Sequence, residues 1–205
     1  MSRNIPENIR SQLGNMSQQK REEVFNYYSR NDKEEGIKTK PYTGKLAVKM
    51  ASDYYGKPIE EMSAAAKHII MEEGFSADPY KDTKGKMTQG VGLTDEFEGK
   101  DFFEEVVPVF EKRAAKITPA YPNLPPNVQE AIFSAVYRGD LSPKHKTAQL
   151  IREGKWAEAA KEYLNHGDYK ASKKQNQEAG RVVHGVQLRM ERNAAAIASM
   201  QPKTK

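Results

Sequence analysis

Two carboxylates and a hydroxyl stand at short intervals near the middle of the chain. Glu73 is followed nine residues later by Asp82, and Thr88 comes six residues after that. Hydrolysis of a glycosidic bond requires an acid that donates a proton, a second carboxylate and a positioned water molecule. These three residues are therefore the candidate catalytic set, and the rest of the chain is expected to position them.

Glu73 ends a stretch that has the periodicity of an amphipathic helix. Apolar residues recur at helical spacing before it: Met62, Ala65, Ala66, Ile69 and Ile70. At about 100° per residue, Glu73 projects into the middle of this stripe and Glu72 falls near its edge. Because loss of solvation raises the pKa of a carboxyl group, this placement favours a protonated Glu73 that acts as a general acid. The alternative is a structural glutamate that is capped or paired.

Residues 80–93 predict a β-hairpin that turns at Asp82-Thr83-Lys84-Gly85, where glycine can take a positive φ. After the turn, strand alternation places Thr88, Gly90 and Gly92 on one face. The other face would carry Met87, Gln89, Val91 and Leu93. A hydroxyl beside two bare backbone positions would let a sugar ring approach closely. The alternative is that the glycines merely permit a tight bend.

Bulk composition excludes several classes of site. Of 205 residues, 37% are hydrophobic and 30% are charged, which is typical of a soluble and rather polar globular protein. The net charge of +5 would attract nucleic acid, acidic lipid or bacterial cell wall, and it selects none of them. Cysteine is absent, so disulfides and thiolate metal sites are excluded. The four histidines show no ligand spacing, so we expect no metal and no other cofactor.

The first sixty residues differ in sequence pattern from the remainder, and we recognise no candidate catalytic or binding residue in them. Helices are expected at about 17–30 and at 44–55, with a stop at Gly56-Lys57-Pro58. We interpret residues 1–60 as a helical extension that docks on the main domain or on a partner. The N-terminus lacks the apolar core of a signal peptide, and no apolar run approaches a membrane span. Synthesis in the cytoplasm is therefore expected, with export by another component.

Helices dominate the chain after the hairpin. Asp101 and Glu104 form a capping-box pattern for a long helix, which Pro108 should kink or start. Residues 117–127, with four prolines, predict a connection. Further helices are expected at 128–138, 147–151, 155–164 and 181–199, whereas the polar stretch 165–179 is expected to be loop-like. The fold class is α+β and mostly helical, with one small β-element.

The front motif resembles the active site of the phage-type lysozymes, the endolysin muramidases of tailed bacteriophages. That family's pattern is Glu-Gly, then Tyr-x-Asp-x-x-Gly, then Thr-x-Gly-x-Gly. Here it is present as Glu73-Gly74, as residues 80–85 and as residues 88–92, with the family's spacings kept. The resemblance covers about residues 61–200, and it is looser beyond the hairpin. It gives a lysozyme domain at 61–205 preceded by the extension at 1–60.

The resemblance implies a two-lobed fold, with a cleft between a hairpin lobe and a helical lobe. Glu73 would protonate the leaving oxygen of the β-1,4 bond between N-acetylmuramic acid and N-acetylglucosamine. Asp82 would stabilise the oxocarbenium charge and, with Thr88, hold the attacking water in an inverting mechanism. Positions that match sugar-contacting residues of the family are Thr94, Tyr137, Arg138 and Thr147.

The same resemblance sets expectations for partners and location. The substrate would be bacterial peptidoglycan, and residues 1–60 could contact a phage virion protein; no membrane span and no specific nucleic acid are expected. The enzyme would be made in the host cytoplasm and reach the periplasmic wall through a holin or by delivery from the virion. It would serve host lysis or entry.

Three departures from the family pattern stand out. Leu93 occupies the position where the family usually has His, so a structural ion pair is missing and the hairpin lobe is expected to be held differently. Arg138 replaces a neutral polar residue common at the cleft, which bears on binding of acidic muropeptides. The first sixty residues have no counterpart in the minimal enzyme and suggest a virion-associated or otherwise specialised lysozyme.

Two other functions remain open. A lytic transglycosylase would cleave the same bond with one acid and no positioned water, so Asp82 and Thr88 argue against it. A non-catalytic phage structural or DNA-associated protein could keep the fold as a module. Retention of all three chemical positions argues against that interpretation.

Overall fold

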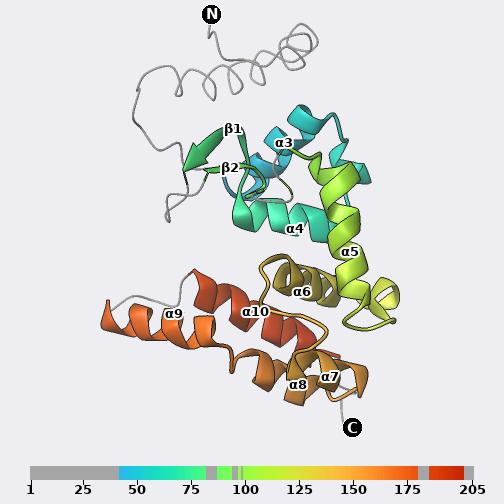
Figure 1. Cartoon of the computed structure of the whole chain (residues 1–205), viewed down its shortest axis with the longest axis vertical. Helices are drawn as coiled ribbons and strands as arrows, with labels where there is room; N and C mark the ends of the chain where they lie inside the picture. The colour runs from blue at the N-terminus through green and yellow to red at the C-terminus, as the bar shows by residue number, and fades with distance from the viewer. Residues whose placement is uncertain (1–41, 82–86, 94–96, 98, 180–184, 201–205) are drawn as a thin grey trace, which may run out of the picture. The chain divides into compact units, whose positions relative to one another are not determined.

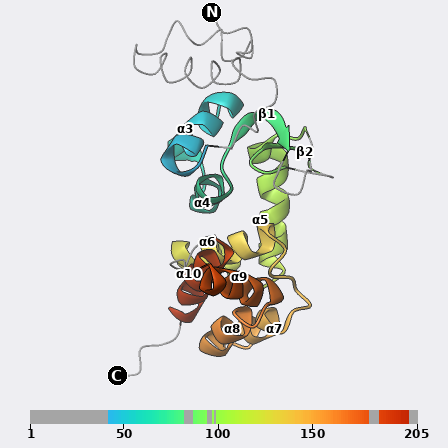
Figure 2. The same cartoon turned by 90° about the vertical axis from the view of Figure 1, so that its left-hand side faces the viewer.

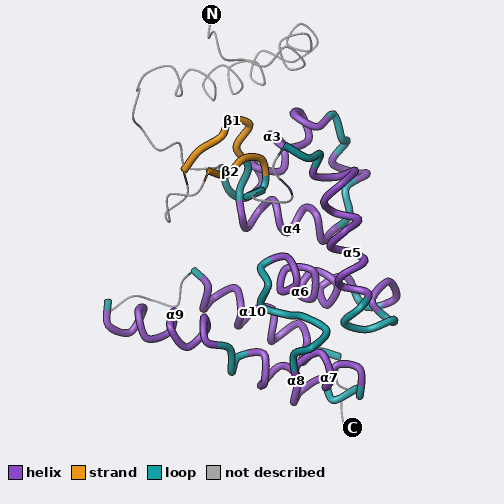
Figure 3. Tube along the Cα trace, in the orientation of Figure 1, coloured by secondary structure: helices purple, strands orange, loops and turns teal. Residues whose placement is uncertain are grey.

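The computed structural model describes residues 42–81, 87–93, 97, 99–179 and 185–200. This part of the chain is mostly helical and contains a two-stranded antiparallel sheet, which confirms the expected mostly helical α+β class (Figures 1 and 3). It divides into two compact units. We call the described residues of 42–62 and 69–103 the hairpin unit, and those of 63–68 and 104–200 the helical unit. The helix expected at 17–30 lies outside the described residues.

The hairpin unit begins with α3, Gly44–Tyr55, which confirms the helix expected at 44–55. Its C-cap, Gly56, has φ 66°, a left-handed conformation that favours glycine, and its N–H bonds to the Ser52 carbonyl. The buried face of α3 consists of Ala47, Val48, Met50 and Ala51. A short 3₁₀ turn, η2 (Ile59–Glu61), leads on to the next helix.

Helix α4, Ala64–Glu73, has the expected buried stripe and ends at the expected glutamate. Ser63 Oγ accepts the Ala66 N–H at 3.2 Å, which satisfies one free donor at the start of the helix. Its buried apolar positions are those that the periodicity predicted: Ala65, Ala66, Ile69 and Ile70, with Met62 just before the helix. Gly74 stops the helix with φ 84°, and its N–H bonds to the Ile70 carbonyl at 3.0 Å.

The sheet is a hairpin of β1 (Ser76–Lys81) and β2 (Met87–Gly90), and it confirms the predicted β-element. Tyr80 pairs with Thr88, and a register shift separates this pair from Ser76 and Gly90. The predicted turn at Asp82-Thr83-Lys84-Gly85 lies outside the described residues. The expected alternation through Leu93 is wrong beyond Gly90, because Gly90 has φ 64° and ends the strand. Val91 and Leu93 are both buried in the turn after β2.

The segment after the hairpin follows the capping prediction in part. Asp101 Oδ1 accepts the Phe103 N–H at 2.8 Å, as a cap would. A π-helical turn, η4 (Phe102–Val106), precedes α5 (Val107–Ala115), so Pro108 lies in the first turn of α5. Proline fits there because the first turn has no intrahelical partner for its missing N–H. This is the second of the two outcomes expected for Pro108.

The helical unit is organised around α10, Val186–Ala198, which packs against α6 (Pro126–Tyr137) and α8 (Trp156–Tyr163). Helix α7 (Lys146–Arg152) packs on α8 (Figure 2). A 3₁₀ turn, η5 (Tyr121–Asn123), lies in the proline-rich connection. The core includes a buried polar cluster. Asn193 donates from Nδ2 to Ser134 Oγ at 3.4 Å and to Tyr163 Oη at 3.3 Å.

The prediction of a loop at 165–179 is wrong, because Gly167–Glu178 forms α9. The helix has no apolar stripe, and its buried residue is Asn176, so hydrophobic periodicity gave no signal. Polar contacts hold it instead. His166 Nδ1 caps it by accepting the Asp168 N–H at 3.2 Å, and Tyr169 Oη donates to Glu191 Oε1 of α10 at 2.9 Å.

Helix α10 also starts later than predicted. It begins at Val186 rather than Arg181, and residues 181–184 lie outside the described part. Val186, its first residue, is half-buried. Its inner face consists of Gln187, Met190, Asn193, Ala194 and Ile197, of which Met190 and Ile197 are fully buried.

Candidate active site

Glu73 is the last residue of α4 and is half-buried. The turn after β2 lies against it: a Cβ built on Gly92 would stand 4.0 Å from the Glu73 Cβ. The end of α4, from Ile69 to Glu73, belongs to the same unit as the two strands, which are drawn with it in Figure 1. The structure thus places the candidate acid beside the second glycine of the Thr-x-Gly-x-Gly motif.

That turn is closed by two backbone hydrogen bonds. The Leu93 N–H donates to the Gln89 carbonyl at 2.8 Å, and the Gln89 N–H donates to the Leu93 carbonyl at 3.3 Å. Both glycines take positive φ, 64° at Gly90 and 72° at Gly92. An L-residue is strained in this region, so the glycine pattern is a requirement of the turn itself.

Thr88 lies on β2, opposite Tyr80 of β1, and its relative exposure is 6%. Glu73 and Thr88 therefore share the hairpin unit, as the predicted set requires. Asp82 lies outside the described residues, and so does Thr94. Their assignment to catalysis and to sugar binding stays a prediction from the motif.

Leu93 holds the hairpin by packing and backbone pairing. It is 5% exposed, and its Cδ1 would lie 3.4 Å from a Cβ built on Gly90. Beside it, Gln89 Nε2 donates to the Ala77 carbonyl at 2.8 Å, which ties β2 to β1 by a side chain. An apolar residue at 93 is thus compatible with a closed turn in which no side-chain ion pair at that position is required.

The other predicted sugar contacts, Tyr137, Arg138 and Thr147, belong to the helical unit. Tyr137 is half-buried, and its ring centroid lies 4.7 Å from that of Phe110. Arg138 Nε lies 3.4 Å from Asp140 Oδ2, and the Asp140 side chain is only 2% exposed. Thr147 is buried in the first turn of α7. Each has a structural role within its own unit, and substrate binding by them stays a prediction.

One group of side chains has the donor types of a metal site. Ligand atoms of Asp140, His166 and Asp168 lie within 4.8 Å of one another. Sequence spacing could not find it, because the residues meet through folding rather than along one helix. Two members already have partners: Asp140 is paired with Arg138 and lies 3.5 Å from Tyr163 Oη, and His166 Nδ1 caps α9. A cation bound here would have to compete with a guanidinium.

The sequence predicted no catalytic or binding residue in α3, yet the end of this helix lies against the turn after β2. A Cβ built on Gly90 would approach Tyr55 Oη to 2.8 Å. The pKa of Tyr55 is raised well above its usual value, chiefly because burial disfavours the phenolate. The available signal was the pair of adjacent tyrosines at the end of a predicted helix, which an amphipathic pattern alone does not explain.

Comparison of the chain with models of protein families, with curated proteins and with solved structures gives no match. Within the described residues, the helices are too short or too polar to cross a membrane.

Proposed function

We propose that this protein is a muramidase of the phage-lysozyme type that hydrolyses the β-1,4 bond between N-acetylmuramic acid and N-acetylglucosamine. The observation that supports it most is the position of Glu73. It ends α4, it is half-buried, and the Gly90–Leu93 turn lies against it, with a Cβ on Gly92 at 4.0 Å. Thr88 belongs to the strand that leads into this turn.

The chemistry follows from the three motif residues. Glu73 donates its proton to the leaving glycosidic oxygen. The leaving sugar then departs as an alcohol rather than as a strongly basic alkoxide. Asp82 stabilises the positive charge that develops on the sugar, and Asp82 and Thr88 hold the water that attacks the opposite face. This is the inverting arrangement, for which two carboxyl groups roughly 6.5–9.5 Å apart leave room for water.

The biological setting proposed is degradation of the host cell wall by a bacteriophage, in lysis or in virion-associated entry. The motif supports this setting through its resemblance to endolysins, and the net charge of +5 suits an acidic wall. The remaining alternatives are a lytic transglycosylase and a non-catalytic module.

Product analysis separates these functions. Purified peptidoglycan is digested with the full chain, and the fragments are examined by mass spectrometry. A muramidase yields reducing ends, and NMR should show that the first product has the α configuration, because inversion converts a β bond. Anhydro-muramyl ends would indicate the transglycosylase, and an undigested wall would indicate a non-catalytic module.

A further inference from the structure

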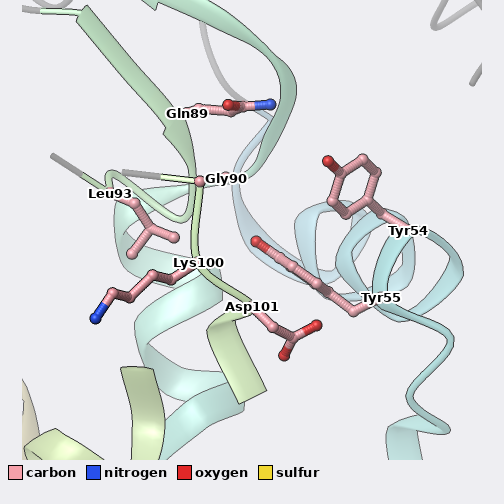
Figure 4. A pocket seen from close by; sticks show the side chains of 8 residues that line it. Tyr54, Tyr55, Gln89, Gly90, Leu93, Lys100 and Asp101 are labelled. Carbon is pink, nitrogen blue, oxygen red and sulfur yellow. The ribbon is translucent and has the colours of Figure 1, made fainter. Parts of the chain in front are cut away.

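A cavity of about 300 Å³ lies in the hairpin unit between the end of α3 and the turn after β2. Figure 4 shows the side chains that line it. Its lining includes Tyr54, Tyr55, Gln89, Gly90, Lys100 and Asp101. All belong to the same compact unit, so the cavity is defined within that unit alone.

The aromatic wall of this cavity is fixed by packing. The rings of Tyr54 and Tyr55 meet edge to face, with centroids 4.9 Å apart and an interplanar angle of 87°. Behind them, Phe75 lies 5.4 Å from the Tyr54 ring, and Phe103 lies 5.5 Å from the Tyr55 ring. Phe75 and Phe103 are buried. A wall held in this way is formed before a ligand arrives, which lowers the entropic cost of binding.

The polar groups of the cavity come from both sides of it. The Tyr55 hydroxyl points towards Gly90, and the Asp101 carboxylate lies beside the Tyr55 ring (Figure 4). Asp101 Oδ1 accepts the Phe103 N–H at 2.8 Å, and each oxygen of a carboxylate can accept more than one hydrogen bond. The charge of Asp101 also contributes, after burial, to raising the pKa values of Tyr54 and Tyr55. A phenol is protonated at neutral pH even at its ordinary pKa, so both hydroxyls can donate.

The chemistry of the lining selects a neutral, hydroxyl-bearing ring. Among the side chains labelled in Figure 4, the cation of Lys100 points away from the tyrosines, whereas the carboxylate of Asp101 lies near them. An anion such as phosphate would meet a like charge there. Sugar hydroxyls can donate to a carboxylate and exchange hydrogen bonds with phenols, and the C–H face of a sugar can rest on aromatic carbon. The volume lies at the small end of ligand sites, which fits one ring rather than a chain.

The cavity adjoins the candidate catalytic residue through one short turn. Gly90 lines the cavity, and Gly92, two residues later, lies against Glu73. We propose that this cavity binds one N-acetylhexosamine unit of the glycan strand, so that α3 supplies part of the substrate site. The identity of the sugar rests on the proposed muramidase function. Helix α3 belongs to the first sixty residues, in which the sequence predicted no catalytic or binding residue.

The test measures binding in the absence of turnover. Full-length Glu73→Gln protein is titrated by calorimetry with a peptide-free tetrasaccharide of alternating N-acetylglucosamine and N-acetylmuramic acid. Asp101→Asn and Tyr54→Phe are then added separately to that background. Asparagine keeps an oxygen for the Phe103 N–H, and phenylalanine keeps the ring, so each variant removes ligand contacts with little change to the wall. Each should weaken binding about tenfold, the usual size for a hydrogen bond to a charged or buried group.

The control is Glu178→Gln, which neutralises an exposed carboxylate of the helical unit, 65% exposed, and should leave the affinity unchanged. Amide NMR of the parent should show shifts at residues 54, 90 and 101 on addition of the tetrasaccharide. Equal affinity of the parent and both cavity variants would overturn the cavity site. If the wild type still hydrolyses the wall in that case, the proposed muramidase activity stands. Binding of free stem peptide in place of the glycan would also overturn it. A wild type that neither binds the glycan nor digests the wall would overturn both proposals.

Discussion

At Gly90 the backbone passes so close to the Tyr55 hydroxyl that a side chain has no room. The motif predicted bare backbone at Gly90 and Gly92 for the approach of a sugar. The structure shows which protein groups lie next to each glycine. A Cβ on Gly90 would meet Tyr55 Oη at 2.8 Å, and one on Gly92 would lie 4.0 Å from the Glu73 Cβ. The two glycines thus bring α3 and α4 against one turn.

A Gly90→Ala substitution should cost more than backbone strain alone. The added Cβ meets the Tyr55 oxygen at 2.8 Å in addition to the positive φ of 64°. We expect a loss of about 2–4 kcal/mol in the free energy of unfolding, measured by urea denaturation. Gly56→Ala is the matched control, because φ there is 66° and nothing lies within 4 Å of its Cβ. Its cost should be about 1–2 kcal/mol.

The Tyr55 hydroxyl can be removed to isolate the clash. In a Tyr55→Phe background, Gly90→Ala should cost no more than Gly56→Ala does. Equal costs for Gly90→Ala with and without the hydroxyl would show that the close approach has no energetic weight.

At the scale of elements, α9 is stabilised by contacts that no hydrophobic pattern could predict. Glu191 of α10 accepts from Tyr169 Oη and from Gln187 Nε2, both at 2.9 Å, and Asn176 donates to Gln187 Oε1 at 3.0 Å. The helix is therefore tied to α10 by a chain of polar groups. Such a network depends on partners being brought together by the fold.

Glu191→Ala should loosen α9 while leaving α10 formed. It removes the shared acceptor of two hydrogen bonds, and bonds to a charged group contribute about 1.5–3 kcal/mol each. Native-state hydrogen exchange should show faster exchange throughout Gly167–Glu178 and little change in α6. The control is Glu178→Ala, which removes an exposed i,i+4 pair with Lys174 and should cost under about 0.5 kcal/mol. Unchanged protection of α9 in Glu191→Ala would refute the role given to this network.

The sequence predicted elements well where burial follows a period, and poorly where it does not. The limits of α3, the end of α4 and the existence of the hairpin were predicted, since apolar spacing and glycine stops mark them. The end of β2 was missed because alternation looks unbroken until the φ of Gly90 is known. The candidate site was predicted in part for the same reason: Glu73 follows from a helical wheel, whereas the contact of Tyr55 with Gly90 joins residues 35 positions apart.

At the scale of the whole molecule, α3 is part of the hairpin unit rather than an appendage to it. Tyr42 and Phe75 exchange two backbone hydrogen bonds, at 3.0 and 2.8 Å, just before α3 and just after α4. Tyr54 and Tyr55 pack on Phe75, which is fully buried. Removal of α3 would expose this core.

Two truncated versions of the chain should therefore differ in melting temperature and in wall hydrolysis. A protein that begins at Ile59 loses α3 and should show a lower melting temperature and little wall hydrolysis. A protein that begins at Pro41 keeps every residue of the described structure and should retain both properties. Full activity of the shorter version would show that the hairpin unit is complete without α3, and it would also remove the basis for the sugar site.

Buried tyrosines make the fold sensitive to alkali. Burial raises the pKa values of Tyr55, Tyr121 and Tyr163 well above the usual 10.0. The unfolded chain loses these protons near pH 10 while the folded chain keeps them, so stability present below pH 10 falls as pH rises further. The slope should reach about 1.4 kcal/mol per pH unit for each tyrosine.

Absorbance of tyrosinate, followed with circular dichroism, tests this directly. Of the ten tyrosines, these three should ionise only as the helical signal is lost. A single transition near the usual pKa with the fold intact would contradict the burial assigned to them.

The role of Glu73 as the acid of a wall hydrolase is tested most directly by the clearing rate of purified peptidoglycan by Glu73→Gln. Glutamine keeps the shape and lacks the proton, so the rate should fall by about a hundredfold or more with an unchanged melting temperature. Glu72→Gln, at the neighbouring half-buried position, is the control and should clear the wall at close to the parental rate. Clearing by Glu73→Gln at the parental rate would contradict the assignment of Glu73 as the general acid.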